Sequence, residues 1–458
     1  MFDPIRATIR FGMGLGPRHA LPQDIDALLT DVTGPDAMAA AYPIAVFSEA
    51  APSIFAFQEA LKHRKAQEEG TAAFDAAQAD EKRLRDLAVA AYQDQVRAQF
   101  FRAIETPIGF RERLVRFWAD HFTVIAPGVT RKHLVAPYIE EAIRPHVGLR
   151  FADMLRAAVT HPAMLIYLQQ ARSIGPNSVV GVRQGKGLNE NLARELLELH
   201  TLGVGGGYLQ ADVRQLAELL AGISYKTSEG VVYNTRRAEP GAETVMGVTY
   251  SDASERAVID AALADLAVHP ATARHIATKL AAHFVADVPD ADLVAAIEAA
   301  FMRTDGDLMA CYAAMLAHPA AWADPAQKVR PPFDFIAGGM RALGVRAANL
   351  QAMEWRKFRG LTALAMRTMG QPWQVPGGPD GWADNAADWI IPQTMAGRIS
   401  WAMVAPTGLL QDLPDPREVV HWALGPEPEQ AVVFAASSAE TTRDGIGVIF
   451  ASPAFNRR

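Results

Sequence analysis

The chain has 458 residues, of which 50% are hydrophobic and 21% are charged, and its formal net charge is −7. This composition is typical of a globular protein with enough apolar material for a core, and it excludes a mainly disordered chain. The acidic balance also excludes a general nucleic-acid-binding surface, which requires a strongly basic face.

The first segment, 1–14, carries charges that interrupt its apolar residues, so it lacks the apolar core of a secretory signal. No later segment reaches the roughly 18 uninterrupted apolar residues of a membrane span. The sequence therefore predicts a chain without a membrane span that is cytoplasmic by default.

Ala-rich segments with helical spacing predict helices over 22–29, 54–69, 71–104, 111–121 and 133–143. Within them, 58–102 is rich in Ala, Gln, Glu, Lys and Arg, which favours a long exposed helix or a hairpin of two helices broken near Gly70. A coiled-coil arm is the alternative, but the apolar positions do not keep a clean heptad.

The pattern changes over 223–250, where β-branched and aromatic residues alternate with turn residues and predict a small β hairpin or insert. Helical spacing then returns over 255–267, 271–284, 293–302, 308–316 and 332–343. The Gly/Pro/Trp-rich segment 370–389 is too broken for a helix and too long for a turn, so it is either functional or packed by its own aromatics. We expect a mainly α-helical, single large domain over 1–458, with a subdivision into 1–330 and 331–458 as the alternative.

Three histidines and one serine precede prolines where a helical segment begins, at His161-Pro162, His269-Pro270, His318-Pro319 and Ser452-Pro453. Proline is tolerated at the first helical position, and the side chain before it can cap the helix. These histidines are therefore interpreted as helix caps and not as metal ligands. The single cysteine, Cys311, lies in an apolar helical pattern and is expected to be an inert, buried thiol.

The segment from Leu188 to Gly203 concentrates polar side chains on one helix. In an α-helix these side chains fall within an arc of about 140°, beside an apolar stripe. The polar arc contains Glu190, Asn191, Arg194, Glu195 and Glu198, and the stripe contains Leu188, Leu192, Leu196 and Leu199. One interpretation is a solvated ladder of the pairs Glu190–Arg194 and Arg194–Glu198. The other is a functional site, and the two remain open on the sequence alone.

The functional interpretation places Asn191, Glu195 and Glu198 inward, where the two carboxylates meet His121 of the 111–121 helix. Two carboxylates and an imidazole from facing helices suit a divalent metal ion. A metal-free version has Arg194 and Tyr208 bind an anionic group, although a helix C-terminus disfavours anions there. The full polar site predicted here comprises Asn191, Arg194, Glu195, Glu198, Tyr208 and Asp212.

Motifs spread over nearly the whole chain resemble a bacterial family catalogued as domain of unknown function 1800. They are Ile9-Arg10-Phe11-Gly12, the helix from Arg113 to Phe122, the helix from Glu190 to Gly203 with Gly207-Tyr208 and Asp212-Val213, Lys279-Leu280 with His283-Phe284, Asp305-Gly306-Asp307-Leu308, Gly381-Trp382 with Trp389 and Arg398, and Ser452-Pro453-Ala454-Phe455.

The resemblance implies no assigned activity. Members of the family are often exported and often encoded beside a second family related to sulfatases and alkaline phosphatases. The resemblance, and the lack of Gly-x-Ser-x-Gly or His-Glu-x-x-His motifs, favour a binding or accessory protein that acts with a partner of that second family. A metal-dependent enzyme, such as a hydrolase using His121, Glu195 and Glu198, is the alternative.

The chain departs from the family pattern at three places. Ala238-Glu239-Pro240-Gly241 stands where relatives show a His-Asp pair before a turn, Ile391-Pro392 stands where they show Asn-Ser, and Leu209 replaces the usual Thr. A site that depends on the His-Asp pair is therefore not expected here.

Overall fold

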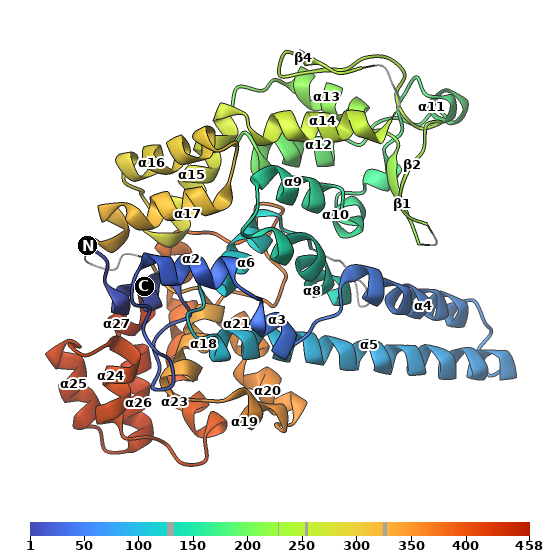
Figure 1. The fold of residues 1–458 in the computed structure, drawn as a ribbon. Helices are drawn as coiled ribbons and strands as arrows, with labels where there is room; N and C mark the ends of the chain where they lie inside the picture. The colour runs from blue at the N-terminus through green and yellow to red at the C-terminus, as the bar shows by residue number, and fades with distance from the viewer. Residues whose placement is uncertain (126–131, 228, 252–254, 324–327) are drawn as a thin grey trace.

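The computed structural model describes residues 1–125, 132–227, 229–251, 255–323 and 328–458. These residues are mainly helical, as the sequence predicts, and the strands that they contain form two antiparallel hairpins. The first pairs β1 (Ile223–Lys226) with β2 (Gly230–Tyr233), and the second pairs β3 (Thr244–Val245) with β4 (Val248–Thr249). Both lie in the predicted 223–250 insert. Figure 1 shows helices α9–α17 in one half of the molecule, α18–α27 in the other, and a helical hairpin that projects from between them.

The N-terminal third begins with short helices and contains the long hairpin. Its elements are α1 (Pro4–Arg6), η1 (Ala7–Phe11), α2 (Ile25–Thr33), α3 (Ala37–Ala41), α4 (Phe47–Lys65), α5 (Ala72–Glu105), α6 (Phe110–His121), η2 (Lys132–Leu134), α8 (Val135–Tyr138), η3 (Ile139–Ile143) and η4 (Arg144–His146). The predicted break at Gly70 is confirmed, because Gly70 adopts a left-handed φ of 85° between α4 and α5. Thr71 then caps α5 by accepting the N–H of Phe74 at 3.1 Å.

The middle third carries the segment that the sequence singled out as polar. Its helices are α9 (Phe151–Val159), α10 (Pro162–Tyr167), η5 (Gln170–Arg172), α11 (Val179–Gln184), α12 (Asn191–Glu195), η6 (Leu196–His200), α13 (Gln210–Leu219), α14 (Arg256–Ala267), α15 (Pro270–Phe284), α16 (Ala291–Arg303), α17 (Leu308–Ala317) and η7 (Pro319–Trp322). Three segments of the chain, η1, η3 and η6, have wide π-helical turns. Such turns are rare and often occur near functional sites.

The C-terminal third packs around a second core. Its helices are α18 (Pro332–Ala342), α19 (Ala347–Gln351), α20 (Trp355–Leu361), α21 (Ala363–Thr368), α22 (Ala386–Trp389), α23 (Pro392–Leu409), α24 (Pro416–Leu424), α25 (Gln430–Ser437), α26 (Thr442–Ala451) and α27 (Pro453–Asn456). Among the described residues, no helix is both long enough and apolar enough to cross a membrane.

The histidines before proline cap helices as predicted. The Nδ1 atoms of His161 and His269 each accept the backbone N–H two residues later at 3.1 Å, and that of His318 does so at 3.3 Å. Ser452 caps α27 in the same way through its hydroxyl. Cys311 is fully buried, and burial raises the pKa of its thiol to about 12, which fits the expected inert role.

Two large hydrophobic clusters form the interior. The first draws its residues from between Ala7 and Trp322, and the second mainly from between Phe333 and Phe455. The elements packed on the first cluster, which include α6, and those packed on the second are the two halves of the molecule. The C-terminal turns of α5, including Phe100, belong to the second cluster, so this helix joins the two halves. The clusters separate near the expected boundary at 330/331, while the division into domains stays a prediction.

A buried carboxylate connects the two halves. Asp334 on α18 bonds the guanidinium of Arg113 on α6 and that of Arg458, the latter at 3.1 Å, and Arg116 lies 3.7 Å away. Asp334, Arg113 and Arg458 are all at least 95% buried. A charge in this environment is stable only while its partners remain.

We therefore expect Asp334→Asn to lower the free energy of unfolding by about 3–5 kcal/mol, because it leaves buried guanidinium groups without their counter-charge. Urea denaturation at pH 7 measures the change. Asp415→Asn is the matched control, since Asp415 pairs with Arg417 at the surface and exposed pairs contribute little. Equal effects of the two substitutions would contradict a special role for Asp334.

Candidate functional site

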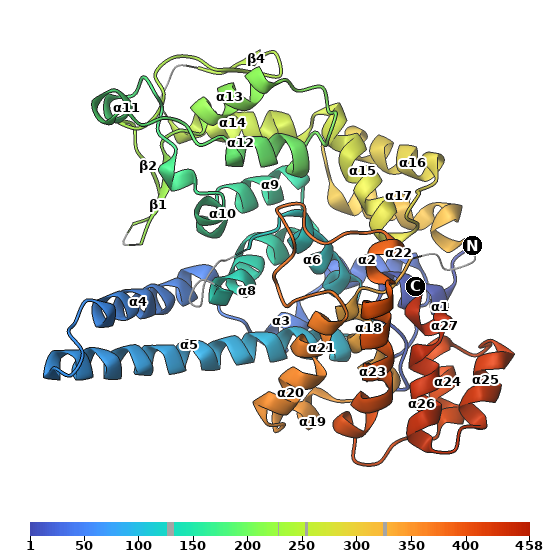
Figure 2. The same ribbon diagram turned by 180° about the vertical axis from the view of Figure 1, so that it is seen from behind.

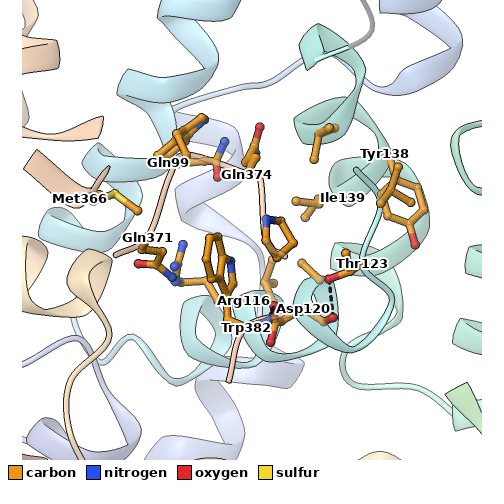
Figure 3. Close-up of a pocket in the computed structure, with 16 residues that line it drawn as sticks. Gln99, Arg116, Asp120, Thr123, Tyr138, Ile139, Met366, Gln371, Gln374 and Trp382 are labelled. Atoms are coloured by element: carbon orange, nitrogen blue, oxygen red, sulfur yellow. Dashed lines mark hydrogen bonds between the residues drawn. The ribbon is translucent and has the colours of Figure 1, made fainter. Parts of the chain in front are cut away.

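A cavity of about 110 Å³ lies where the two halves meet. Helices α5 and α6 and the α8–η3 segment form one wall, and α21 with the segment 371–382 forms the other. Figure 3 shows Gln99 and Gln374 at one end of the cavity and Arg116, Asp120 and Trp382 together at the other. Ligand sites often occupy such junctions between packed units.

Helix α6 supplies the charged residues of the cavity. Leu114, Phe117 and Trp118 are buried and fix the helix in the first core, which leaves Arg116 and Asp120, one turn apart, on the cavity side. The guanidinium of Arg116 stacks over the ring of Phe333, 3.5 Å from its centroid. Arg116 is therefore held in place by packing as well as by Asp334.

The segment 371–382 approaches Asp120 very closely. The backbone N–H of Trp382 donates to Asp120 Oδ1 at 2.9 Å. The preceding Gly381 has a left-handed φ of 82°, and a Cβ atom there would lie 2.6 Å from the same oxygen. Only glycine permits this contact. Figure 2 shows the segment, coloured orange, passing along α6.

Asp120 has an unusual proton affinity for a carboxyl group. Burial raises its pKa to about 7, the charge of Asp384 adds to the rise, and the Trp382 N–H, Lys279 and Arg116 oppose it. The group therefore exchanges its proton near neutral pH while lining a cavity. Carboxyl groups with such pKa values are concentrated at functional sites.

The cavity also contains hydrogen-bond donors without partners. Both Trp373 Nε1 and Gln374 Nε2 are buried and have no hydrogen-bond partner among the residues that the structure describes. Neighbouring Gln371 is satisfied, because its Oε1 accepts the N–H of Phe333 at 2.9 Å. Buried donors normally find an acceptor, so these two atoms indicate a place for one.

A His–Asp pair lies in a smaller adjoining cavity that Arg116 and Asp120 also line. The Nδ1 atom of His283 is 2.9 Å from Asp384 Oδ1. Burial lowers the pKa of His283 to about 4, so the ring is neutral at pH 7. The charges of His283, Lys328 and Lys279 hold the pKa of Asp384 near 2 despite burial.

The structure places the sequence-predicted polar residues beside this cavity system and not in it. Burial and the charges of Glu198 and Asp380 raise the pKa of Glu195, so Asp380 of the loop lies near these carboxylates. Burial and a hydrogen bond with Glu198 raise the pKa of Tyr208. Glu195, Glu198 and Tyr208 therefore form one group at the outer side of the loop.

The remaining predicted residues have structural contacts. Arg194 pairs with Glu190 at 3.3 Å, as the ladder predicts, and also bonds Gln210. Asp212 accepts the N–H of Leu209 at 2.8 Å, which is one half of a capping box, while the Leu209 side chain has no oxygen for the other half. The inward position expected for Asn191 is wrong, because this residue is exposed at the first turn of α12.

His121 lies in a buried histidine group on the other side of α6. Each ring of the pair His121 and His200 donates an N–H to the other's backbone carbonyl, at 3.2 and 3.0 Å. His275 joins them, 6.1 Å from His121 between ring centroids. Among the described residues, no three His, Cys, Asp or Glu side chains are grouped to hold a metal ion. The metal site of His121, Glu195 and Glu198 stays a prediction that these contacts do not support.

Sequence reasoning missed most residues of the cavity. The Gly/Pro/Trp-rich segment 370–389 indicated a functional or aromatic-packed loop, and it does contain Trp373, Gln374 and Trp382. Its composition, however, does not show which of its side chains line a cavity. Arg116 and Asp120 sit one helical turn apart in a motif already singled out, where His121 attracted the functional interpretation instead. Their meeting with the loop joins residues 262 apart in the sequence, which no local pattern reveals.

Comparison with known proteins identifies a family but no characterised relative. The family model described as "Protein of unknown function (DUF1800)" matches residues 6–457, so the chain belongs to this family. No curated protein and no solved structure matches the chain. Three of the motifs that carried the resemblance meet at the cavity system, namely the Arg113–Phe122 helix, the one with His283, and Gly381-Trp382.

The buried histidines should make stability depend on pH. Burial lowers the pKa of His200 to about 3 and of His275 to about 4, and the pKa of His121 also lies well below its ordinary value. The unfolded chain therefore takes up protons first, so this stabilisation is complete above about pH 6.5 and is lost as the pH falls. Asp120 changes stability in the opposite direction as the pH falls, since its raised pKa favours protonation of the folded state. Its contribution offsets that of about one histidine.

We expect the free energy of unfolding to fall below pH 6 by up to about 1.4 kcal/mol per pH unit for each histidine that is not offset. Urea titrations between pH 5 and 7 measure this slope. His200→Asn should reduce this slope by the contribution of about one proton, whereas His421→Asn, at an exposed position, should leave the slope unchanged. Identical slopes in all three proteins would show that His200 does not contribute.

Proposed function

We propose that this member of the family binds a small polar molecule in the cavity between its two halves. The observation that carries the proposal is the set of donors there: Arg116, Trp373 and Gln374 line the same cavity, and the side-chain N–H groups of the latter two have no hydrogen-bond partner among the described residues. A ligand that offers acceptor atoms would satisfy them. The apolar side chains between them, such as Val115 and Ile139, would contact its carbon atoms.

The backbone at Gln374 supports the same conclusion. Its φ of 53° lies in the left-handed region, which costs a residue with a side chain roughly 1–2 kcal/mol. Glycine would remove that cost, yet the position carries a cavity-lining glutamine whose buried amide nitrogen has no hydrogen-bond partner among the described residues. Strain kept at such a position is characteristic of functional sites.

The proposal belongs to the class of binding or accessory proteins that the sequence favours. The partner from a sulfatase- or alkaline-phosphatase-related family, the cytoplasmic location and the absence of nucleic-acid binding stay predictions. A second candidate function is an enzyme that uses Asp120 as a general acid or base. It is favoured by one observation, the pKa of about 7 in a cavity next to Arg116. Loss of a bound ligand over time, followed by NMR, would distinguish turnover from binding.

The binding proposal predicts that a member of a panel of small carboxylates, amides and polyols stabilises the protein in a concentration-dependent way. Trp373→Phe removes a single N–H donor and should weaken that ligand by about threefold to tenfold, because one hydrogen bond contributes roughly 0.5–1.5 kcal/mol. Calorimetric titration measures the affinity. Trp355→Phe, at a tryptophan outside the cavity lining, is the matched control and should bind normally. If no compound in the panel binds, the proposal fails.

The strain at Gln374 gives a separate prediction. Gln374→Gly should raise the free energy of unfolding by up to about 1 kcal/mol, since relief of the left-handed backbone exceeds the extra entropy of unfolded glycine. The same variant should bind the ligand more weakly, because the amide donor is gone. Denaturation and titration of one preparation measure both effects. A variant that is less stable would show that the amide serves the fold.

A further inference from the structure

We propose that the ligand of the cavity is a short-chain organic acid, bound as a carboxylate whose negative charge balances a surplus of buried arginines. This inference rests on the proposed binding function and specifies its ligand class. Its basis is the distribution of charge around Asp334, together with the shape and lining of the cavity.

Buried positive charge exceeds negative charge at this junction. Among the described residues, the charge of Asp334 acts on the guanidinium groups of five arginines. Three of them pair with it or approach within 3.7 Å, namely Arg113, Arg116 and Arg458. The charge of Asp334 also acts on Arg330 and Arg398, which are buried as well. One carboxylate cannot neutralise five cations, and uncompensated buried charge is strongly unfavourable.

The other carboxylates nearby supply only part of the missing negative charge. Asp384 acts on Arg458 but also on Lys279 and Lys328, and Glu112 acts on Arg116 but pairs with Arg144. Lys328 in turn pairs with Asp287 at 2.6 Å. Asp120 faces the cavity itself but is partly protonated at neutral pH. The arginine surplus therefore remains, and Arg116 is the member that reaches the ligand cavity.

Hydrogen bonding favours a carboxylate as the source of this charge. A guanidinium binds planar carboxylates through charge-assisted bonds, and the N–H groups of Trp373 and Gln374 add neutral donors in the same space. Phosphate carries no carbon atoms for the apolar side chains of the lining, whereas an organic carboxylate does. The organic carboxylate is therefore the better match.

Size and lining select a short carbon chain. A cavity of about 110 Å³ is smaller than the roughly 150 Å³ that holds benzene, so the part of the ligand that it encloses has few carbon atoms. The lining offers apolar contacts from Val115, Val135 and Met366. A chain of two or three carbons beyond the carboxylate would fit there.

Titration calorimetry with propionate and with propionamide tests the inference, because the two differ in charge and little in shape. We expect propionate to bind at least tenfold more tightly than propionamide at pH 6.5, and inorganic phosphate to bind more weakly than propionate. Equal affinity for the acid and the amide, or a preference for phosphate, would overturn the carboxylate assignment while leaving a binding cavity. Absence of binding by any compound of the wider panel would instead remove the proposed function.

Two variants locate the charge. Arg116→Gln should reduce the preference for propionate over propionamide to less than threefold. Trp373→Phe should weaken the binding of propionate but keep that preference. If Arg116→Gln does not fold, Trp373→Phe still tests whether the ligand lies in this cavity.

A third variant tests the role of Asp120. Asp120→Asn keeps an acceptor for the Trp382 N–H but cannot ionise. We expect the affinity of the wild-type protein for propionate to fall severalfold between pH 6 and 8, and the affinity of Asp120→Asn for propionate to stay constant. A pH dependence that the variant retains would contradict a role for Asp120.

Discussion

The shared carboxylate of Asp334 is the constraint on which the rest of the architecture depends. It joins α18 to α6 through Arg113 and to the end of the chain through Arg458, so it fixes how the two cores meet. Burying these charges costs desolvation energy that a well-packed apolar contact would avoid. Unlike an apolar contact, this ionic contact depends on the orientation of its groups. It therefore fixes the rotation of α6 about its axis and thereby the positions of Arg116 and Asp120.

Rigid and adaptable elements divide the work at the cavity. Helix α6 carries the charged groups on a face fixed by buried Leu114, Phe117 and Trp118. The segment 371–382 carries neutral donors on irregular backbone, anchored where the Trp382 N–H bonds Asp120. This anchor also explains the proton affinity of Asp120, because the loop that donates one hydrogen bond simultaneously excludes water from the carboxylate. Gly381 makes the close approach sterically possible.

Local sequence patterns predicted most helices, the hairpin at Gly70, the β insert and the histidine caps, since each depends on neighbours along the chain. They failed where long-range packing decides. Leu197 is fully buried and Leu199 is only half-buried, so the buried stripe of this segment differs from the predicted one. Arg116 and Asp120 look like ordinary helix charges until the loop meets them. Hydrophobic periodicity does not predict a contact between residues so far apart in the sequence.

Several groups that oppose stability lie at the same junction. Strained Gln374, Asp120 with its raised pKa and the arginine surplus are each unfavourable in an isolated fold, and all lie at or next to one cavity system. Structural ion pairs, such as Arg102 with Glu140, show balanced charge instead. Strain also occurs elsewhere, for example at Asp305, so it is the combination of unpaired donors, strain and positive charge that distinguishes this junction. The proposed ligand, carrying the complementary charge and acceptors, would satisfy these groups together.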